Sequence, residues 1–480
     1  MSAVEVEACV AILEDHFGPL VSYVGKVLLG EAAVLSILYQ RVRGTLDFVE
    51  LKRALIILAQ HGILRFAQDE RQRVIYSTQT IDVLRLLRAA RCSFVAKTLY
   101  GEIAETICEE LVSQGRLTCS SCIRRVAARL EVDIVQVKNI FARLAETQFV
   151  MRCPKVESKF CGCPVFVQHV DPFMVPDAIL EAGKKERVSF LQKHFTCILF
   201  PDSQSRKRKH SEDPDADIYW CVNFLRFERY LRDEMVVMAY KSGDACHENC
   251  IKVLQLLLKV AELKADSSAA SSSPISIHDV VRTSSANNMG LEKHDIKTAL
   301  QLLCESSCIV RKVGESCGGL FVIDFEKAIT LHCQRHIESA IREKLDLRAV
   351  RVFRLLTQKG FLEEDHIEKL AMLSTKEARE LCYNLLEKEF VLMKHVAKTN
   401  DFAPARTIYL YYVDLSVVAH NLYVSTCKIS EVEEMYLTPS DRATLEKYRK
   451  GQLALMSAEI ELDHDLLLYS LFLKFARRKL

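Results

Sequence analysis

The sequence predicts a mainly α-helical chain with small β-hairpins, built as a tandem array of four similar units and closed by a pair of helices. Two observations predict this class. A stretch whose periodicity changes from helical to extended recurs four times, and the final segment, 421–480, shows helical periodicity only. Recurrence at long intervals indicates that each unit is one supersecondary module.

The first copy of the recurring stretch spans residues 49–65. In every copy an apolar residue lies three positions before a leucine, so that both lie on one helical face, and two more apolar residues begin an extended run five and six positions after it. The aligned pairs are Leu55 and Leu58, Phe141 and Leu144, Leu300 and Leu303, and Cys382 and Leu385. A helix that runs through a tight turn into a β-hairpin is typical of a winged-helix domain. We therefore predict four extended winged-helix domains.

The remaining elements follow from periodicity and from the turn residues between them. In the first unit we predict helices over 5–30, broken at Phe17-Gly18-Pro19, over 32–42 and over the recurring stretch, then a hairpin of 63–67 with 73–77. The second unit opens near Thr80 and continues with helices over 102–114, 119–130 and 133–147. The third has an apolar helix over 250–263 and a hairpin of 309–313 with 320–325, and the fourth a hairpin of 390–395 with 407–414.

The interval between the second and third copies is much longer than the other two, which predicts an insertion. Periodicity disappears after Pro154, where prolines and charges accumulate, and a helical pattern resumes at Tyr219. The predicted divisions are winged helices at 1–79, 80–170, 219–328 and 329–420, a partly disordered insertion at 171–218, and a C-terminal helical hairpin at 421–480, in which Asp463-His464-Asp465 marks a break between helices.

Composition bounds the class of protein. A formal charge of +2 over 480 residues does not suit a chain that binds polyanions over its whole surface, so any nucleic-acid contact must come from local basic patches. The 18 cysteines are scattered through apolar helical patterns without a signal peptide, which predicts reduced thiols. No apolar run has the length of a membrane span. We expect a soluble intracellular protein without membrane contact.

A basic residue begins each recurring helix. Because the amino-terminal end of a recognition helix points into the groove of DNA, these residues are candidates for phosphate or base contact. The alternative is a solvated helix face, on which exposed lysines are common. The candidates are Lys52 with its neighbour Arg53, Lys138 and Lys297, and the fourth helix carries Arg379 at the same position.

A denser basic cluster opens the second unit. Its candidate DNA contacts are Arg85, Arg88, Arg91 and Lys97. Phe94 and Tyr100 lie among them, and aromatic side chains between basic ones suit single-stranded nucleic acid, because bases stack while phosphates pair. In the alternative, the two aromatic residues belong to the core and the arginines form surface ion pairs.

Two further motifs have a possible function. The run Arg206, Lys207, Arg208 and Lys209 lies in a polar segment and is a candidate nuclear import signal.

Cys119 and Cys122 have CxxC spacing, and Cys153 lies near Cys161 and Cys163, but no second pair follows at the usual interval. Since zinc needs four ligands, we expect incidental thiols, no metal and no cofactor, with Cys153, Cys161 and Cys163 the least improbable exception. Phosphate-loop, dinucleotide, zincin and nucleophile-elbow motifs are missing, so we expect no enzyme.

Specific segments resemble one family, the large winged-helix subunit of the RNA polymerase III-specific heterotrimer, which is related to the alpha subunit of TFIIE. They are residues 15–18 (DHFG), 97–101 (KTLYG) and 144–150 (LAETQFV), the last running into Arg152-Cys153-Pro154, and the resemblance extends over essentially the whole chain. It implies a nuclear, non-catalytic polymerase subunit on the clamp that assists promoter opening. The implied partners are the two other heterotrimer subunits, the polymerase III core, the initiation factor TFIIIB, and DNA, single-stranded at the bubble.

Two other classes of function fit the sequence less well. A free-standing transcription factor would read bases with Asn, Gln or Arg side chains on its recognition helices. The first helix offers Lys52, Arg53 and Gln60, but the fourth offers Arg379, Glu380 and Asn384, an unconvincing set of base readers. An enzyme on a helical scaffold has no motif in its favour.

Overall fold

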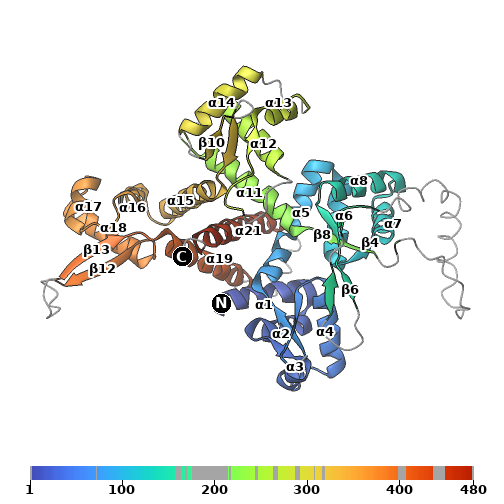
Figure 1. The fold of residues 1–480 in the computed structure, drawn as a ribbon. Helices are drawn as coiled ribbons and strands as arrows, with labels where there is room; N and C mark the ends of the chain where they lie inside the picture. The colour runs from blue at the N-terminus through green and yellow to red at the C-terminus, as the bar shows by residue number, and fades with distance from the viewer. Residues whose placement is uncertain are drawn as a thin grey trace, which may run out of the picture. The chain divides into compact units, whose positions relative to one another are not determined.

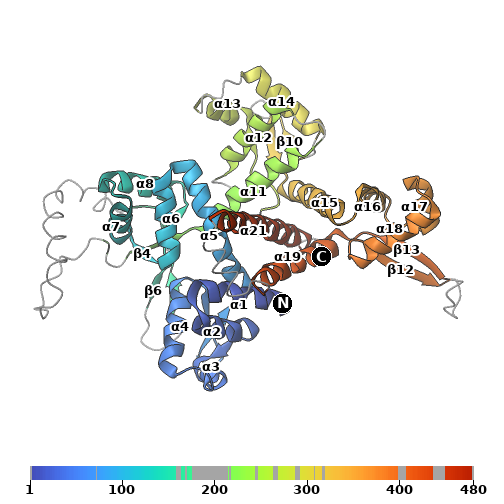
Figure 2. The same cartoon turned by 180° about the vertical axis from the view of Figure 1, so that it is seen from behind.

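The computed structural model describes residues 3–71, 73–157, 164–167, 170–175, 215, 218–243, 247–262, 269–286, 292–306, 309–315, 319–397, 407–435 and 449–477. They belong to two compact units, Met1–Phe227 with Glu431–Asp463 and Glu228–Ser430 with His464–Leu480. The chain is mainly α-helical, with small antiparallel sheets (Figures 1 and 2), as predicted. Each unit is described by itself.

The first winged-helix domain has the predicted helices and hairpin in order, but a short strand, β1 (Ala33–Val34), lies where the helix over 32–42 was expected to begin. Its elements are α1 (Ala3–Phe17), α2 (Pro19–Gly30), β1, α3 (Leu35–Val42), α4 (Phe48–Gln60), β2 (Leu64–Gln68) and β3 (Val74–Thr78), and the strand order is β1-β3-β2. Helix α4 contains the first recurring stretch. It begins at Asp47, which forms a capping box with Glu50, so two backbone N–H groups that would lack partners are satisfied.

The second domain differs from prediction at its last strand. Its elements are α5 (Thr80–Tyr100), α6 (Glu102–Gln114), β4 (Leu117–Thr118), α7 (Cys119–Leu130), α8 (Ile134–Glu146), β5 (Val150–Arg152), a hairpin of β6 (Lys155–Glu157) with β7 (Val165–Val167), and β8 (Tyr219–Val222). The helical pattern predicted to resume at Tyr219 is wrong there, because β8 pairs with both β4 and β5. Strand β8 therefore completes the sheet of the second domain, and the sequence between β5 and β8 interrupts that sheet.

The third and fourth domains lie in the second compact unit. The third consists of α11 (Phe224–Lys241, which begins in the first unit), α12 (Glu248–Ala261), β9 (Ile275–Ser276), α13 (Ile277–Ala286), α14 (Lys293–Ser306), β10 (Val310–Gly314) and β11 (Leu320–Ile323). The fourth consists of α15 (Phe325–Lys344), α16 (Leu347–Lys359), α17 (Glu364–Ala371), α18 (Thr375–Glu387), β12 (Leu392–Ala397) and β13 (Thr407–Tyr412). The predicted hairpins are confirmed by the antiparallel pairs β10 with β11 and β12 with β13.

The four recurring helices bury the residues that defined them. Leu58, Leu144, Leu303 and Leu385 are all 0% exposed. A hydrogen bond then closes each helix end in the described copies: the N–H of Ile63, Phe149 or Phe390 donates to the carbonyl of the aligned leucine. The preceding residue, Gly62, Gln148 or Glu389, has a positive φ of 72°, 67° or 62°. This left-handed cap turns the chain from the helix into the wing strand.

Replacing Gln148 with glycine is expected to stabilise the protein by roughly 0.5–1 kcal/mol, because glycine adopts a positive φ without the steric cost that a side chain incurs. Gln148→Ala keeps that cost and should leave stability nearly unchanged. Thermal unfolding of the full chain measures both. A melting temperature for the glycine variant equal to or lower than that of the unaltered chain would contradict a steric cost at Gln148.

The C-terminal segment contains α19 (Leu415–Met435) and α21 (Arg449–Arg477). The break predicted at Asp463-His464-Asp465 is wrong, since α21 continues through it. The physical reason is that these polar side chains have partners: Asp463 lies against α5 in the first unit, and Asp465 lies 3.1 Å from His336 of α15 in the second. Whether the two helices form a hairpin remains a prediction.

Candidate nucleic-acid interface

Helix α5 turns two of the four clustered basic residues inward. Arg88 and Arg91 are only 6% and 8% exposed. The Nε of Arg88 lies 3.2 Å from Asp463 Oδ1, and Nη1 of Arg91 lies 3.9 Å from Oδ2 of the same carboxylate. The assignment of these two arginines to a DNA-contacting surface is therefore corrected: they are part of a buried charge cluster. The sequence analysis did not identify Asp463 as their partner, because the polar run Asp463-His464-Asp465 resembled a break between two helices.

The other two members of that cluster are at least partly exposed. The Arg85 side chain is about one quarter exposed, and it donates to Asp82, which also accepts two hydrogen bonds from Arg65. Lys97 is half exposed with its Nζ 2.7 Å from Glu105, and this hydrogen bond raises the pKa of the lysine. Both cations thus have acidic partners, as the ion-pair alternative expected.

The aromatic residues of the cluster lie in different environments. Phe94 is 61% exposed and is not a core residue. Tyr100, by contrast, packs edge-on against the buried Phe149 with ring centroids 6.0 Å apart, and Arg143 lies over its ring. The interleaved stacking surface is therefore not formed as a unit, because only Phe94 and Lys97 present their side chains substantially to solvent.

Helix α4 presents a basic and apolar face to solvent. Lys52 and Arg53 are exposed, and Val49 and Ile56 are 52% and 63% exposed on the same helix. The Lys52 Nζ lies 4.4 Å from the centroid of the Phe48 ring, a cation–π contact that orients the ammonium along the helix. This face combines positive charge with apolar contact area, which suits phosphate as well as a protein partner.

The aligned basic residues of the other recognition helices do not share this environment. Lys138 of α8 is 8% exposed, so its assignment as a surface contact is corrected. Lys297 of α14 is exposed. Arg379 of α18 is exposed but lies 2.8 Å from Glu364, which raises the pKa of the guanidinium. Position in the repeat therefore does not determine exposure.

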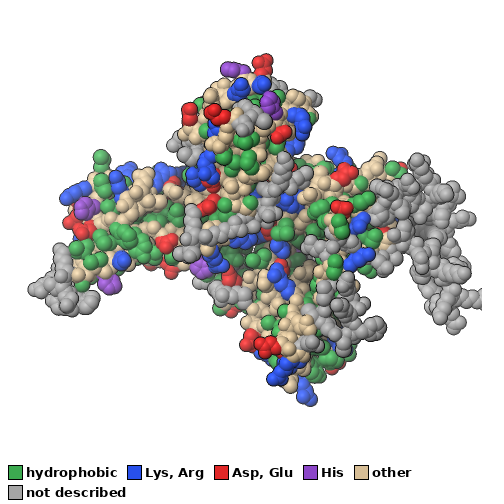
Figure 3. Space-filling view, in the orientation of Figure 1, with side chains coloured by type: hydrophobic (Ala, Val, Ile, Leu, Met, Phe, Trp, Pro, Cys, Tyr) green, Lys and Arg blue, Asp and Glu red, His purple; other side chains and the backbone are tan. Residues whose placement is uncertain are grey.

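The fourth domain has exposed apolar side chains on both faces of its wing, which the sequence analysis did not identify. Met393 and Tyr409 lie on one face of the hairpin and Val396 on the other, and all three are at least 40% exposed, as is Phe361 beside the wing. The Phe361 ring packs against Tyr412, and Lys394 lies 6.0 Å from its centroid. In Figure 3 hydrophobic side chains gather at the surface over β12 and β13. Alternation gave no signal here, because the four consecutive residues 393–396 of β12 are all exposed.

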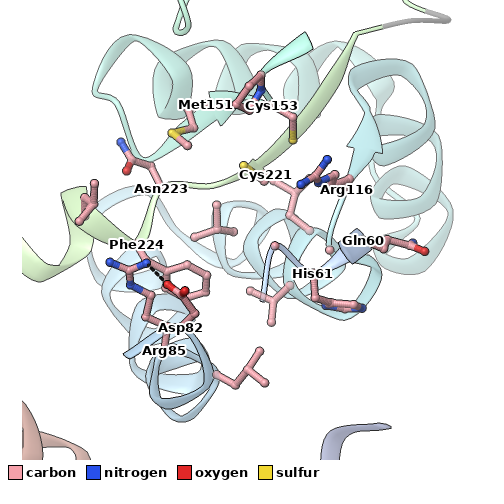
Figure 4. Close-up of a pocket in the computed structure, with 18 residues that line it drawn as sticks. Gln60, His61, Asp82, Arg85, Arg116, Met151, Cys153, Cys221, Asn223 and Phe224 are labelled. Atoms are coloured by element: carbon pink, nitrogen blue, oxygen red, sulfur yellow. Dashed lines mark hydrogen bonds and ion pairs between the residues drawn. The ribbon is translucent and has the colours of Figure 1, made fainter. Parts of the chain in front are cut away.

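A cavity of about 240 Å³ lies within the first unit. Its wall combines the end of α4, the start of α5, the end of α6 and the strands β5 and β8; the labelled residues in Figure 4 are Gln60, His61, Asp82, Arg85, Arg116, Met151, Cys153, Cys221, Asn223 and Phe224. Burial, together with the charges of His16 and Arg116, lowers the pKa of His61 to about 4. His61 is therefore neutral at physiological pH.

The cysteines suggest no metal centre in the part of the chain that the structure describes. No group of three or more His, Cys, Asp or Glu residues there could hold an ion. Cys119 and Cys122 are buried in α7, and burial raises the pKa of both thiols. Cys161 and Cys163 lie outside the described residues, as does the candidate import run Arg206 to Lys209. Among the described residues, no helix is long and apolar enough to cross a bilayer.

Comparison with known proteins agrees with this architecture. Family models match residues 7–69 (RNA polymerase III subunit RPC82 helix-turn-helix domain), 139–331 (RNA polymerase III subunit RPC82) and 337–413 (POLR3C, C-terminal winged-helix domain). The DNA-directed RNA polymerase III subunit RPC3 of Mus musculus is 31% identical over 486 residues, covering 96% of this chain and 89% of its own. The subunits of Homo sapiens and Danio rerio are each 30% identical with the same coverage. The chain therefore belongs to the family of the RNA polymerase III subunit RPC3.

Proposed function

We propose that the chain acts in the nucleus as a non-catalytic subunit of DNA-directed RNA polymerase III, within the heterotrimer that serves initiation. The observation that carries this proposal is the similarity over 96% of the chain to subunits of that polymerase. A near-neutral charge and four winged-helix domains support a role in which most domains bind protein. The proposed partners are the two other heterotrimer subunits, the polymerase clamp and TFIIIB.

We further propose that the subunit assists promoter opening through a limited contact with DNA, single-stranded at the bubble. Lys52 and Arg53 on α4 are the main candidates, because both cations are exposed. Lys297 and the pair Phe94 and Lys97 are secondary candidates, since Lys97 already has Glu105 as a partner. Arg85, which already forms an ion pair with Asp82, would contribute least to DNA binding.

Reversing the charge of both α4 residues tests this contact. In assembled polymerase III, Lys52→Glu with Arg53→Glu should weaken binding to promoter DNA by roughly tenfold, uniformly over DNA sequences, because two phosphate contacts are lost. The reactivity of unpaired thymines with permanganate would fall with it. Both are measured at fixed salt concentration.

The matched control is Lys26→Glu with Arg43→Glu, which makes the same change of charge at exposed positions of the same domain outside α4. Equal loss of opening in both variants would show a general effect of charge and would contradict a contact at α4. Purified chain alone should incorporate no nucleotides, and template-dependent synthesis by it would contradict the non-catalytic assignment.

The alternative of a free-standing sequence-specific factor is not favoured. The relatives are named as polymerase subunits, and the recognition helices do not share an exposed set of base-reading side chains. In two of them the aligned basic residue is buried, as in Lys138, or held by a carboxylate, as in Arg379.

A further inference from the structure

Two cysteines from distant parts of the sequence meet on one sheet. Cys153 follows β5, and its N–H donates a 2.8 Å hydrogen bond to the carbonyl of Tyr219 in β8. The next residue on the same face of β8 is Cys221, since side chains alternate along a strand. Figure 4 shows both side chains close to one another at the wall of the cavity. Cys221 pairs in register with Met151, two residues before Cys153, so the two cysteines are diagonal neighbours on one face of the sheet.

The cavity distinguishes this pair from the other described cysteines. Cys153 and Cys221 both line it, and Cys221 is partly exposed. Most other described cysteines are buried in helices, where the surrounding apolar side chains exclude small polar reagents; they are Cys9, Cys92, Cys108, Cys119, Cys122, Cys250, Cys333 and Cys382. Cys304 is also partly exposed, but among the described residues no cysteine affects the pKa of its thiol. Cys153 is itself only 6% exposed, so the cavity of about 240 Å³ is the route by which a small hydroperoxide would reach it.

The neighbours of Cys153 lower the pKa of its thiol. The hydrogen bond from the Cys221 thiol lowers the pKa of Cys153, and the positive charge of Arg116 lowers it further, against an opposing effect of burial. The pKa of Cys221 is raised well above its usual value by the same hydrogen bond and by burial. One cysteine is thus suited to be the nucleophile, because thiolates and not thiols attack, and its neighbour to remain the proton-bearing partner.

We propose that Cys153 and Cys221 form a peroxide-sensitive pair that closes into a reversible disulfide. The Cys153 thiolate attacks one oxygen of hydrogen peroxide, the O–O bond breaks, and the departing hydroxide takes a proton to become water, which leaves a sulfenic acid. The sulfur of Cys221 then attacks the Cys153 sulfur, the S–O bond breaks, and the Cys221 proton leaves with the hydroxide as a second water. The two thiols lose two electrons and peroxide gains them.

The bond would have a structural consequence within the second domain. It would tie the end of β5 to β8 and so close the sequence between them, the segment that interrupts the sheet, into a loop. Closing a long loop restricts the unfolded chain, so the oxidised protein should unfold at a higher temperature than the reduced protein. A thiol reductant would reverse the change.

Peptide mass spectrometry of the full chain after treatment with hydrogen peroxide tests the proposal. We expect a cross-linked pair of peptides containing Cys153 and Cys221, two hydrogens lighter than their sum, that disappears with dithiothreitol. In Cys221→Ser the cross-link is lost and Cys153 stops at the sulfenic acid, which dimedone traps. Cys304→Ser is the control and should form the cross-link as readily as the unaltered chain.

Two results would overturn the proposal. The first is a cross-link from Cys153 to Cys161 or Cys163 in place of Cys221. The second is peroxide-treated chain in which both cysteines are still alkylated by iodoacetamide, or in which Cys153 is oxidised beyond the sulfenic acid while Cys221 stays reduced.

Discussion

Replacing Asp463 with alanine is expected to lower the free energy of unfolding by about 3–5 kcal/mol, the cost of removing one partner of a buried ion pair. Asp463 is 2% exposed, and its carboxylate faces Arg88 and Arg91, which are buried as well. The alanine variant would leave two guanidinium groups in an environment of low polarity. Urea unfolding of the full chain, followed by circular dichroism, measures the change as a lower midpoint at unchanged slope.

Glu461 provides the matched control for Asp463. It lies on the same helix two residues away and is exposed, so Glu461→Ala should change stability by less than about 0.5 kcal/mol. A triple variant with Asp463→Leu, Arg88→Met and Arg91→Met should recover most of the loss, because apolar residues of similar volume can replace a buried charge cluster. If Asp463→Ala is as stable as the control, the cluster does not hold α21 against α5.

Replacing Trp220 with alanine is expected to cost about 3–5 kcal/mol, the range for removing a large aromatic side chain from a core. Trp220 is 0% exposed at the centre of the sheet β4-β8-β5, and its ring packs edge-on against Phe141 with centroids 5.3 Å apart. The loss should be confined to the second domain. The substitution removes the chain's one tryptophan and with it the tryptophan fluorescence signal. Hydrogen exchange of the β5 amides is therefore the suitable measurement.

Tyr219→Ala is the control on the same strand. Its side chain lies on the opposite face of β8 and is 48% exposed, so it should leave β5 exchange nearly unchanged. A Trp220→Ala variant whose β5 amides remain as protected as those of the control would contradict the assignment of β8 to the second domain.

The sequence was most informative where an element is specified locally. The ends of α4 and α8, two residues after Leu58 and Leu144, and the turns that follow them depend on short-range periodicity and turn residues. The same signals predicted the hairpins of β2 with β3 and β12 with β13, which the structure contains. Strand β8 could not be found in this way. Its four residues have no alternation that distinguishes them from the helix α11 that follows, and its partners β4 and β5 lie far upstream in the chain.

Ion pairs between residues distant in the sequence also explain why some candidate DNA-contacting residues proved to be buried. Arginines at 88 and 91 have the spacing of a surface cluster, and only their partner Asp463, distant in sequence, shows that α5 is covered there. The Lys138 side chain is buried although Lys52, its counterpart in the repeat, is exposed. Burial of a basic residue depends on what packs against the helix, which local sequence does not specify.

Affinity purification of the tagged full chain from nuclear extract tests the central claim most directly. The account predicts that the core subunits of RNA polymerase III and the two other heterotrimer subunits are recovered with it in equal amounts, and that they stay bound in salt high enough to release DNA. Recovery of the chain free of every polymerase III subunit, at low salt and from cells in which it is expressed at its natural level, would contradict it.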